Sequence, residues 1–152
     1  MLKEGERLPF FDRVDQKGTL VKSDQFIGKK PLVVFFYPKN YTPGCTAEVC
    51  SFRDKYTDFV DYGAAVIGIS TDSLRSHERF SESFDLPFSL LSDSDKSLQK
   101  AFKINKQFLG ILSRRVSFVF DIEGKLILAY DSLNPISHIY KALKTLKKET
   151  VV

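Results

Sequence analysis

The sequence predicts an α/β fold with a mixed central sheet and helices on both faces. Residues 31–37 and 64–70 are continuous apolar runs with the length and β-branched content of buried strands. A helical pattern lies between them, so the three segments form a parallel βαβ unit. Residues 116–121 and 125–130 are strand-like segments that a short turn separates, which adds an antiparallel hairpin and makes the sheet mixed.

The N-terminal half gives the first elements in order. Turn signals at 15–18 (DQKG) and 27–30 (IGKK) predict a short N-terminal hairpin that caps the sheet. A loop at 38–44 follows the first buried strand. The helix after it has apolar residues at three- and four-residue spacing and ends at Gly63. The apolar residues of this stripe are Val49, Phe52, Tyr56 and Phe59.

The C-terminal half supplies the remaining elements. We expect a helix at about 73–84, a short strand at 88–91 and a helical turn at 94–102. An amphipathic helix that begins near Pro135 closes the chain. This order of elements is that of a thioredoxin-like mixed sheet, with residues 85–114 as an insertion.

The composition indicates that residues 1–152 form a single domain. The chain has 152 residues and is 43% hydrophobic, enough for an ordinary core without a structural disulfide. No window approaches about 18 consecutive apolar residues, and the N-terminus is charged from its third residue. We therefore expect no membrane span and no secretory segment, and a cytoplasmic location in which thiols stay reduced.

The net charge of +4 does not indicate a nucleic-acid partner. The 23 basic residues are interspersed with 19 acidic ones, as on an ordinary solvated surface. The densest basic run, residues 141–148, lies where positive charge complements the C-terminal end of the last helix.

Both cysteines of the chain, Cys45 and Cys50, lie close to the predicted start of a helix. A helix N-terminus leaves about four backbone N–H groups without partners and carries roughly half a positive charge. A sulfur held there loses its proton more readily than one in free solution. We interpret Cys45, which the helical stripe places on the inward face, as a nucleophile, while Cys50 faces another way.

The cysteine spacing restricts the chemistry. Five residues of helix rise roughly 7.5 Å and rotate about 140°, which separates the Cα atoms of Cys45 and Cys50 by about 8 to 9 Å. A disulfide needs them within roughly 7 Å. A Cys45–Cys50 disulfide therefore requires the first helical turns to unwind. This geometry suits a two-step redox cycle, with a folded form that holds a lone reactive thiolate and a locally unwound form in which the second thiol reaches the first.

Two other kinds of cysteine site fit less well. A disulfide oxidoreductase is expected to have C-x-x-C at this position, whereas this chain has C-x-x-x-x-C. Zinc would need two further ligands, and His77 and His138 lie far apart in sequence. We expect no metal.

The segment 38–54, PKNYTPGCTAEVCSFRD, resembles the active-site signature of the peroxiredoxins, specifically the bacterioferritin comigratory protein or peroxiredoxin Q type. P-x-x-x-T-x-x-C is the catalytic motif of that family, and a second cysteine five residues on is a mark of this subgroup. Residues 4–12, 64–73, 86–95 and 115–118 also fall where the family has matching segments. The resemblance covers most of the chain.

The resemblance implies a role for each matching residue. Cys45 matches the peroxidatic cysteine, and Cys50 the resolving cysteine that forms an intramolecular disulfide with it. Thr42 matches the hydroxyl that binds the peroxide and faces the thiolate, and Pro38 the residue that shields the pocket. Arg115 matches the guanidinium that stabilises the thiolate and the transition state. These donors suit a reaction in which negative charge develops on the peroxide oxygens.

The resemblance also implies the partners. The substrates are hydrogen peroxide and organic hydroperoxides, no metal, haem or flavin cofactor is needed, and thioredoxin or a similar dithiol protein reopens the disulfide. Because the resolving cysteine lies in the same chain, we expect a monomer, with a dimer as the alternative. A peroxide sensor and a thioredoxin-fold adaptor without turnover are the rival functions.

Several neighbouring residues have plainer interpretations. Arg114 and Arg115 face opposite sides of a strand, so only one of them can point at the sulfur. The family pattern Arg-x-Ser/Thr-Phe implies that it is Arg115, which leaves Arg114 as a surface charge. His77 shares a stripe with apolar residues and is expected in the core, and His138 receives no catalytic role. Glu48 either supports the first turn of the helix or tunes the thiolate, and the sequence favours the structural role.

Overall fold

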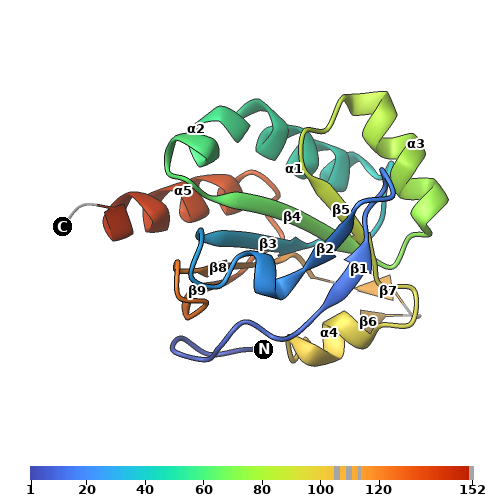
Figure 1. The fold of residues 1–152 in the computed structure, drawn as a ribbon. Helices are drawn as coiled ribbons and strands as arrows, with labels where there is room; N and C mark the ends of the chain where they lie inside the picture. Colours follow the sequence, from blue (N-terminus) through green and yellow to red (C-terminus); the bar gives the residue numbers. More distant parts are fainter. Residues whose placement is uncertain (105–106, 109–110, 113, 151–152) are drawn as a thin grey trace.

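The computed structural model describes residues 1–104, 107–108, 111–112 and 114–150, and a five-stranded mixed sheet forms its centre (Figure 1). The strand order is β5-β4-β3-β8-β9, in which β3 pairs in parallel with β4 and antiparallel with β8. The strands are β3 (Leu32–Phe36), β4 (Ala65–Ser70), β5 (Ser89–Ser92), β8 (Val116–Phe120) and β9 (Leu126–Asp131). The predicted α/β fold with a thioredoxin-like mixed sheet is confirmed.

Helices cover the sheet on both faces, and short β-structures lie outside it (Figure 1). The helices are α1 (Pro43–Asp54), α2 (Tyr56–Asp61), α3 (Leu74–Phe84), α4 (Ser97–Ala101) and α5 (Ser137–Thr150), with a 3-10 turn η1 (Ser23–Gln25). The hairpins are β1 (Asp12–Val14) with β2 (Leu20–Lys22), and β6 (Gln107–Phe108) with β7 (Ile111–Leu112). The predicted N-terminal hairpin is thus a separate two-stranded sheet.

The central strand β3 is buried over all five residues, because both of its faces carry a core. Its side chains alternate between the faces. Val34 and Phe36 pack with the N-terminal segment and α4, whereas Val33 and Phe35 pack with α1, α2, α3 and α5. Apolar residues on both sides explain why this strand has no polar alternation.

Two expected elements differ from the structure. The helical stripe that was expected to run to Gly63 is divided into α1 and α2 at Lys55, whose φ of −102° and ψ of 10° leave the helical region. Gly63 then ends α2 with a φ of +73°, which glycine adopts without steric cost. The expected insertion at 85–114 begins inside the main sheet, because β5 pairs in parallel with β4. Residues 105–106, 109–110 and 113 of that expectation lie outside the described residues.

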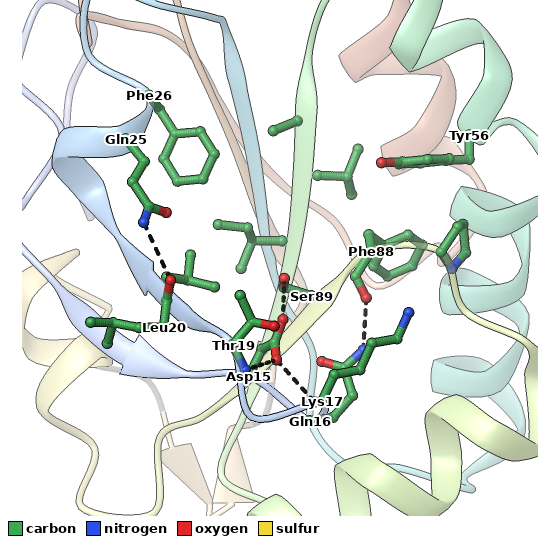
Figure 2. Close-up of a pocket in the computed structure, with 15 residues that line it drawn as sticks. Asp15, Gln16, Lys17, Thr19, Leu20, Gln25, Phe26, Tyr56, Phe88 and Ser89 are labelled. Carbon is green, nitrogen blue, oxygen red and sulfur yellow. Dashed lines mark hydrogen bonds between the residues drawn. The ribbon is translucent and has the colours of Figure 1, made fainter.

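A pocket of about 300 Å³ lies between the N-terminal hairpin and the edge of the sheet at β4 and β5 (Figure 2). Its polar groups tie the hairpin to the sheet. Ser89 Oγ donates to Asp15 Oδ2 at 2.8 Å, and Gln16 Nε2 donates to the Phe88 carbonyl at 2.9 Å (Figure 2). No cysteine lines this pocket, so the cysteine chemistry belongs elsewhere.

Candidate active site

The site begins where β3 ends and α1 starts. Thr42 holds the N-cap position in extended conformation, and Pro43 is the first helical residue, which suits its fixed φ and missing N–H. The Thr42 hydroxyl makes no capping bond and instead donates to the Lys39 carbonyl at 2.8 Å. The Thr42 side chain is therefore held by the loop, not by the helix. Cys45 follows in the first turn of α1.

The Cys45 sulfur is buried but has hydrogen-bond donors beside it. The residue is only 1% exposed and packs in the apolar cluster that includes Val49. Arg115 Nη1 lies 3.2 Å from Sγ, and the backbone N–H of Lys39 lies 3.5 Å from it. A thiolate here would be shielded from water and stabilised by two donors, one of which carries a full charge.

Arg115 is fixed immediately before β8. Its Nη1 also donates to Glu48 Oε1 at 3.1 Å, and its Nε donates to the Leu133 carbonyl at 3.2 Å. The neighbouring Arg114 lies elsewhere and forms an ion pair with Asp131. The geometry therefore places Arg115, and not Arg114, against the sulfur.

Gly44 lies in the predicted loop 38–44 and in the signature segment, and the structure adds a steric reason for glycine there. It lies in the first turn of α1, directly before Cys45. A Cβ atom at Gly44 would collide with Nη2 of Arg115 and would lie 3.3 Å from its Cζ. Glycine weakens a helix, so its presence in a first turn was the available signal that another group needs the space.

Glu48 is fully buried on the inward face of α1, where its Oε1 contacts Arg115. Burial is the main cause that raises its pKa to about 8, against the lowering effect of Arg115. The sequence left two roles open for Glu48, support of the helix start and tuning of the thiolate, and favoured the first. The contact of Glu48 with Arg115 joins it to the surroundings of the sulfur.

His138 extends the same group of buried residues from α5. It is fully buried, and its Nδ1 lies 2.7 Å from Ser117 Oγ and 4.0 Å from Glu48 Oε2. Its Nε2 lies 2.8 Å from the Ser132 carbonyl. Burial lowers the pKa of His138, so the ring is neutral at pH 7. Sequence reasoning gave His138 no role because its neighbours come from distant segments.

Cys50 lies on the same helix in a different environment. Both cysteines are free thiols, and α1 is continuous between them, so the helical spacing predicted from the sequence holds. Cys50 is partly exposed, and partial burial raises the pKa of its thiol. It is therefore a protonated thiol at neutral pH in this conformation.

The loop that carries Lys39 is anchored by Asn40. The Asn40 backbone N–H donates to Asp72 Oδ2 at 2.9 Å, and its Nδ2 lies 3.1 Å from Ser76 Oγ and 3.0 Å from His77 Nδ1. The Tyr37 hydroxyl donates to Asn40 Oδ1 at 2.6 Å. His77 is thus a buried anchor of this loop, as expected for a core residue, and does not face the sulfur.

Pro38 lies in the same loop and is half-buried. Among the described residues, no group of three or more His, Cys, Asp or Glu side chains is arranged to hold a metal ion. In the same part of the chain, no helix has the length and apolar character needed to cross a bilayer.

A thioredoxin-like sheet that presents a shielded cysteine to an arginine at the start of a helix is the architecture of a thiol-dependent peroxidase. Residues 5–129 match the AhpC/TSA family. The chain belongs to this family, and its relatives place it among the peroxiredoxins of the Q and Bcp type. It is an enzyme, a thiol-dependent peroxidase, as the sequence resemblance predicted.

Three comparisons illustrate the relationship. The chain is 41% identical over 145 residues to the chloroplastic peroxiredoxin Q of Sedum lineare, covering 95% of this chain and 77% of that protein. The structure of peroxidoxin BcpB from Mycobacterium tuberculosis matches with a TM-score of 0.89 and 34% identity, over 97% of this chain and 98% of that one. The Xanthomonas campestris bacterioferritin comigratory protein, described for its alkyl peroxide reduction activity, matches with a TM-score of 0.84 and 31% identity over 91% of both chains.

Proposed function

We propose that this peroxidase reduces hydrogen peroxide and organic hydroperoxides with Cys45 as its nucleophile, and that residues 1–152 form one catalytic domain. The observation that carries the assignment is the Arg115 guanidinium, 3.2 Å from a sulfur that is almost fully buried. An ionised, poorly solvated sulfur with a fixed cation beside it is the nucleophile that cleavage of an O–O bond needs. The alkyl peroxide activity of the Xanthomonas campestris relative supports the wider substrate class.

The first step forms a sulfenic acid. The Cys45 thiolate attacks the terminal peroxide oxygen, the S–O bond forms as the O–O bond breaks, and the leaving hydroxide or alkoxide takes up a proton. The Thr42 hydroxyl donates a hydrogen bond to the Lys39 carbonyl, so its lone pairs are free to accept a hydrogen bond from the O–H of the peroxide. Arg115 and the backbone N–H of Cys45 donate to the oxygens on which charge develops. Pro38 shields the pocket from water.

The second step uses Cys50 as the resolving thiol. The Cys50 thiol condenses with the Cys45 sulfenic acid, which forms the disulfide and releases water. Because both residues lie on the continuous helix α1, the first turns must unwind before the sulfurs meet. Unwinding also exposes the Cys50 thiol, which lowers the pKa that partial burial raises.

The disulfide returns to two thiols by exchange with a dithiol protein of the thioredoxin type, which the family implies. No partner subunit needs to supply a cysteine, so we propose a monomer. The cycle needs a reducing compartment such as the cytosol, although the plant relative is named as chloroplastic.

The test is peroxide consumption by the wild type, Cys45→Ser and Cys50→Ser with thioredoxin and its reductase. We expect Cys45→Ser to lose the reaction with peroxide. Cys50→Ser should keep the first turnover and then recycle poorly, while the neighbouring control Ser51→Ala behaves like the wild type. Full activity in Cys45→Ser, or wild-type consumption that stops at one peroxide per chain, would contradict the proposal.

A further inference from the structure

Glu48 carries an unusual atom for a protein interior. Within the described part of the chain, its Oε2 is the one buried side-chain oxygen or nitrogen without a hydrogen-bond partner. Desolvation disfavours an ionised carboxylate when one of its oxygens is buried without a hydrogen bond. The protonation state of Glu48 can explain why this oxygen has no partner.

The ring nitrogen that faces Glu48 Oε2 is not a hydrogen-bond donor. The Ser132 carbonyl can only accept, so His138 Nε2 carries the ring proton and donates it there. In the neutral ring, Nδ1 is then an acceptor, and its lone pair accepts a hydrogen bond from the Ser117 hydroxyl at 2.7 Å. Nδ1 therefore has no proton to donate to Glu48 Oε2, which lies 4.0 Å away. This environment disfavours a carboxylate anion and favours a carboxylic acid.

The charges around the other carboxyl oxygen, Glu48 Oε1, also favour the neutral acid. Arg115 Nη1 reaches both Cys45 Sγ, at 3.2 Å, and Glu48 Oε1, at 3.1 Å. One positive charge thus faces two groups that can become anions, and both are buried. Two anions around one guanidinium would repel each other strongly at low dielectric.

The other titratable or charged groups around Glu48 and His138 do not change this balance. Burial raises the pKa of Tyr37, which stays neutral. Asp131 is already ion-paired with Arg114, and the Tyr130 ring packs edge-on against His138 with 4.9 Å between the ring centroids. No second cation among these groups is available to balance an ionised Glu48.

We propose that Glu48 is a positioning residue that acts in its protonated form. As a neutral acid it accepts a hydrogen bond from Arg115 but does not neutralise the guanidinium. The positive charge of Arg115 is then available to stabilise the Cys45 thiolate. When Glu48 ionises at alkaline pH, it competes with the thiolate for Arg115, and the reaction with peroxide slows. This inference rests on the proposed role of Cys45. It assigns to Glu48 a function that acts through Arg115 and not on the peroxide itself.

The first test is the pH dependence of the peroxide reaction, measured as the rate of Cys45 oxidation in a single turnover of the Cys50→Ser protein. With a pKa of about 8, roughly a tenth of Glu48 remains protonated at pH 9, so we expect a fall of up to about tenfold between pH 7 and pH 9. When Glu48→Gln is introduced into the Cys50→Ser protein, the glutamine keeps a neutral acceptor for Arg115, and this alkaline fall should disappear. Glu82→Gln, an exposed glutamate on α3, is the matched control and should retain it.

A second measurement needs no variant. In reduced wild-type protein with carbon-13 in its glutamate carboxyl groups, we expect one resonance to titrate near pH 8. An alkaline fall that persists in Glu48→Gln, or the absence of any glutamate resonance that titrates near pH 8, would overturn the inference. If the resonance titrates near pH 8 but Cys45 does not react with peroxide, the proposed function fails and the protonation of Glu48 still stands.

Discussion

The two cysteines of α1 lie five residues apart and yet occupy opposite environments. Cys45 is almost fully buried, with the Arg115 guanidinium and the Lys39 amide at its sulfur. Cys50 is partly exposed, and burial raises the pKa of its thiol while Arg53 opposes that effect. This contrast suits the two different steps that we propose for Cys45 and Cys50.

This difference comes from the position of each cysteine along the helix. The N-terminal turn of α1 follows the loop after β3 and meets the residue before β8, so Cys45 comes close to a group that is distant in sequence. Cys50 has turned away from that contact. Reactivity is therefore a property of the place in the fold, and substitutions around each sulfur should affect the two steps separately.

Among the substitutions considered, removal of the Arg115 guanidinium should most reduce the difference between Cys45 and Cys50. We expect Arg115→Gln to slow the reaction of Cys45 with peroxide by about 10²- to 10³-fold, because one charged donor to the sulfur and the peroxide oxygens is lost. Stopped-flow measurement in the Cys50→Ser protein isolates this step. The adjacent Arg114→Gln, which removes only the ion pair with Asp131, should stay close to the parent rate. Equal losses in the two variants would contradict the assignment.

A smaller loss should follow from displacing the guanidinium instead of removing it. Gly44→Ala places a Cβ atom against Arg115 Nη2, and a shift of about 1 Å can cost up to about 10²-fold in rate. The helix itself should not suffer, because alanine favours helix by up to about 1 kcal/mol over glycine. Denaturant unfolding should therefore show no loss of stability, while the reaction with peroxide becomes slower. A variant that keeps the full rate would show that Arg115 moves aside without consequence.

The smallest expected effect concerns only the Cys50 step. Ala47 is exposed between the two cysteines, and Ala47→Gly weakens α1 by about 1 kcal/mol, which should speed disulfide formation by up to about fivefold. The rate of sulfenic acid formation should not change. Glu82→Gly places the same kind of defect in α3, which carries no cysteine, and should alter neither rate. Slower disulfide formation in Ala47→Gly would argue against unwinding as the controlling event.

Sequence patterns predicted the parts of this fold that depend on neighbouring residues. The apolar run at 31–37 identified the central strand, and the helical stripe placed Cys45 inward. The division of the helix at Lys55 was not predicted, because the apolar spacing continues through it while the backbone does not.

The candidate site was predictable only where a motif marked it. Cys45 and Arg115 came from recognisable patterns, but Glu48 meets His138 only because α1 and α5 pack on the same face of the sheet. The need for glycine at position 44 likewise depends on the approach of Arg115. Contacts between distant segments leave no periodic signal in one sequence.

The anchoring of Asn40 has a consequence for the repeated use of this enzyme. Its bonds run to Asp72, Ser76 and His77, which lie outside the helical turn that separates the cysteines. We expect this frame to stay in place while that turn opens and closes. In the proposed cycle, the helical turn would then refold against this fixed frame each time the disulfide is reduced, and Cys45 would return to the same position before the next oxidant molecule arrives.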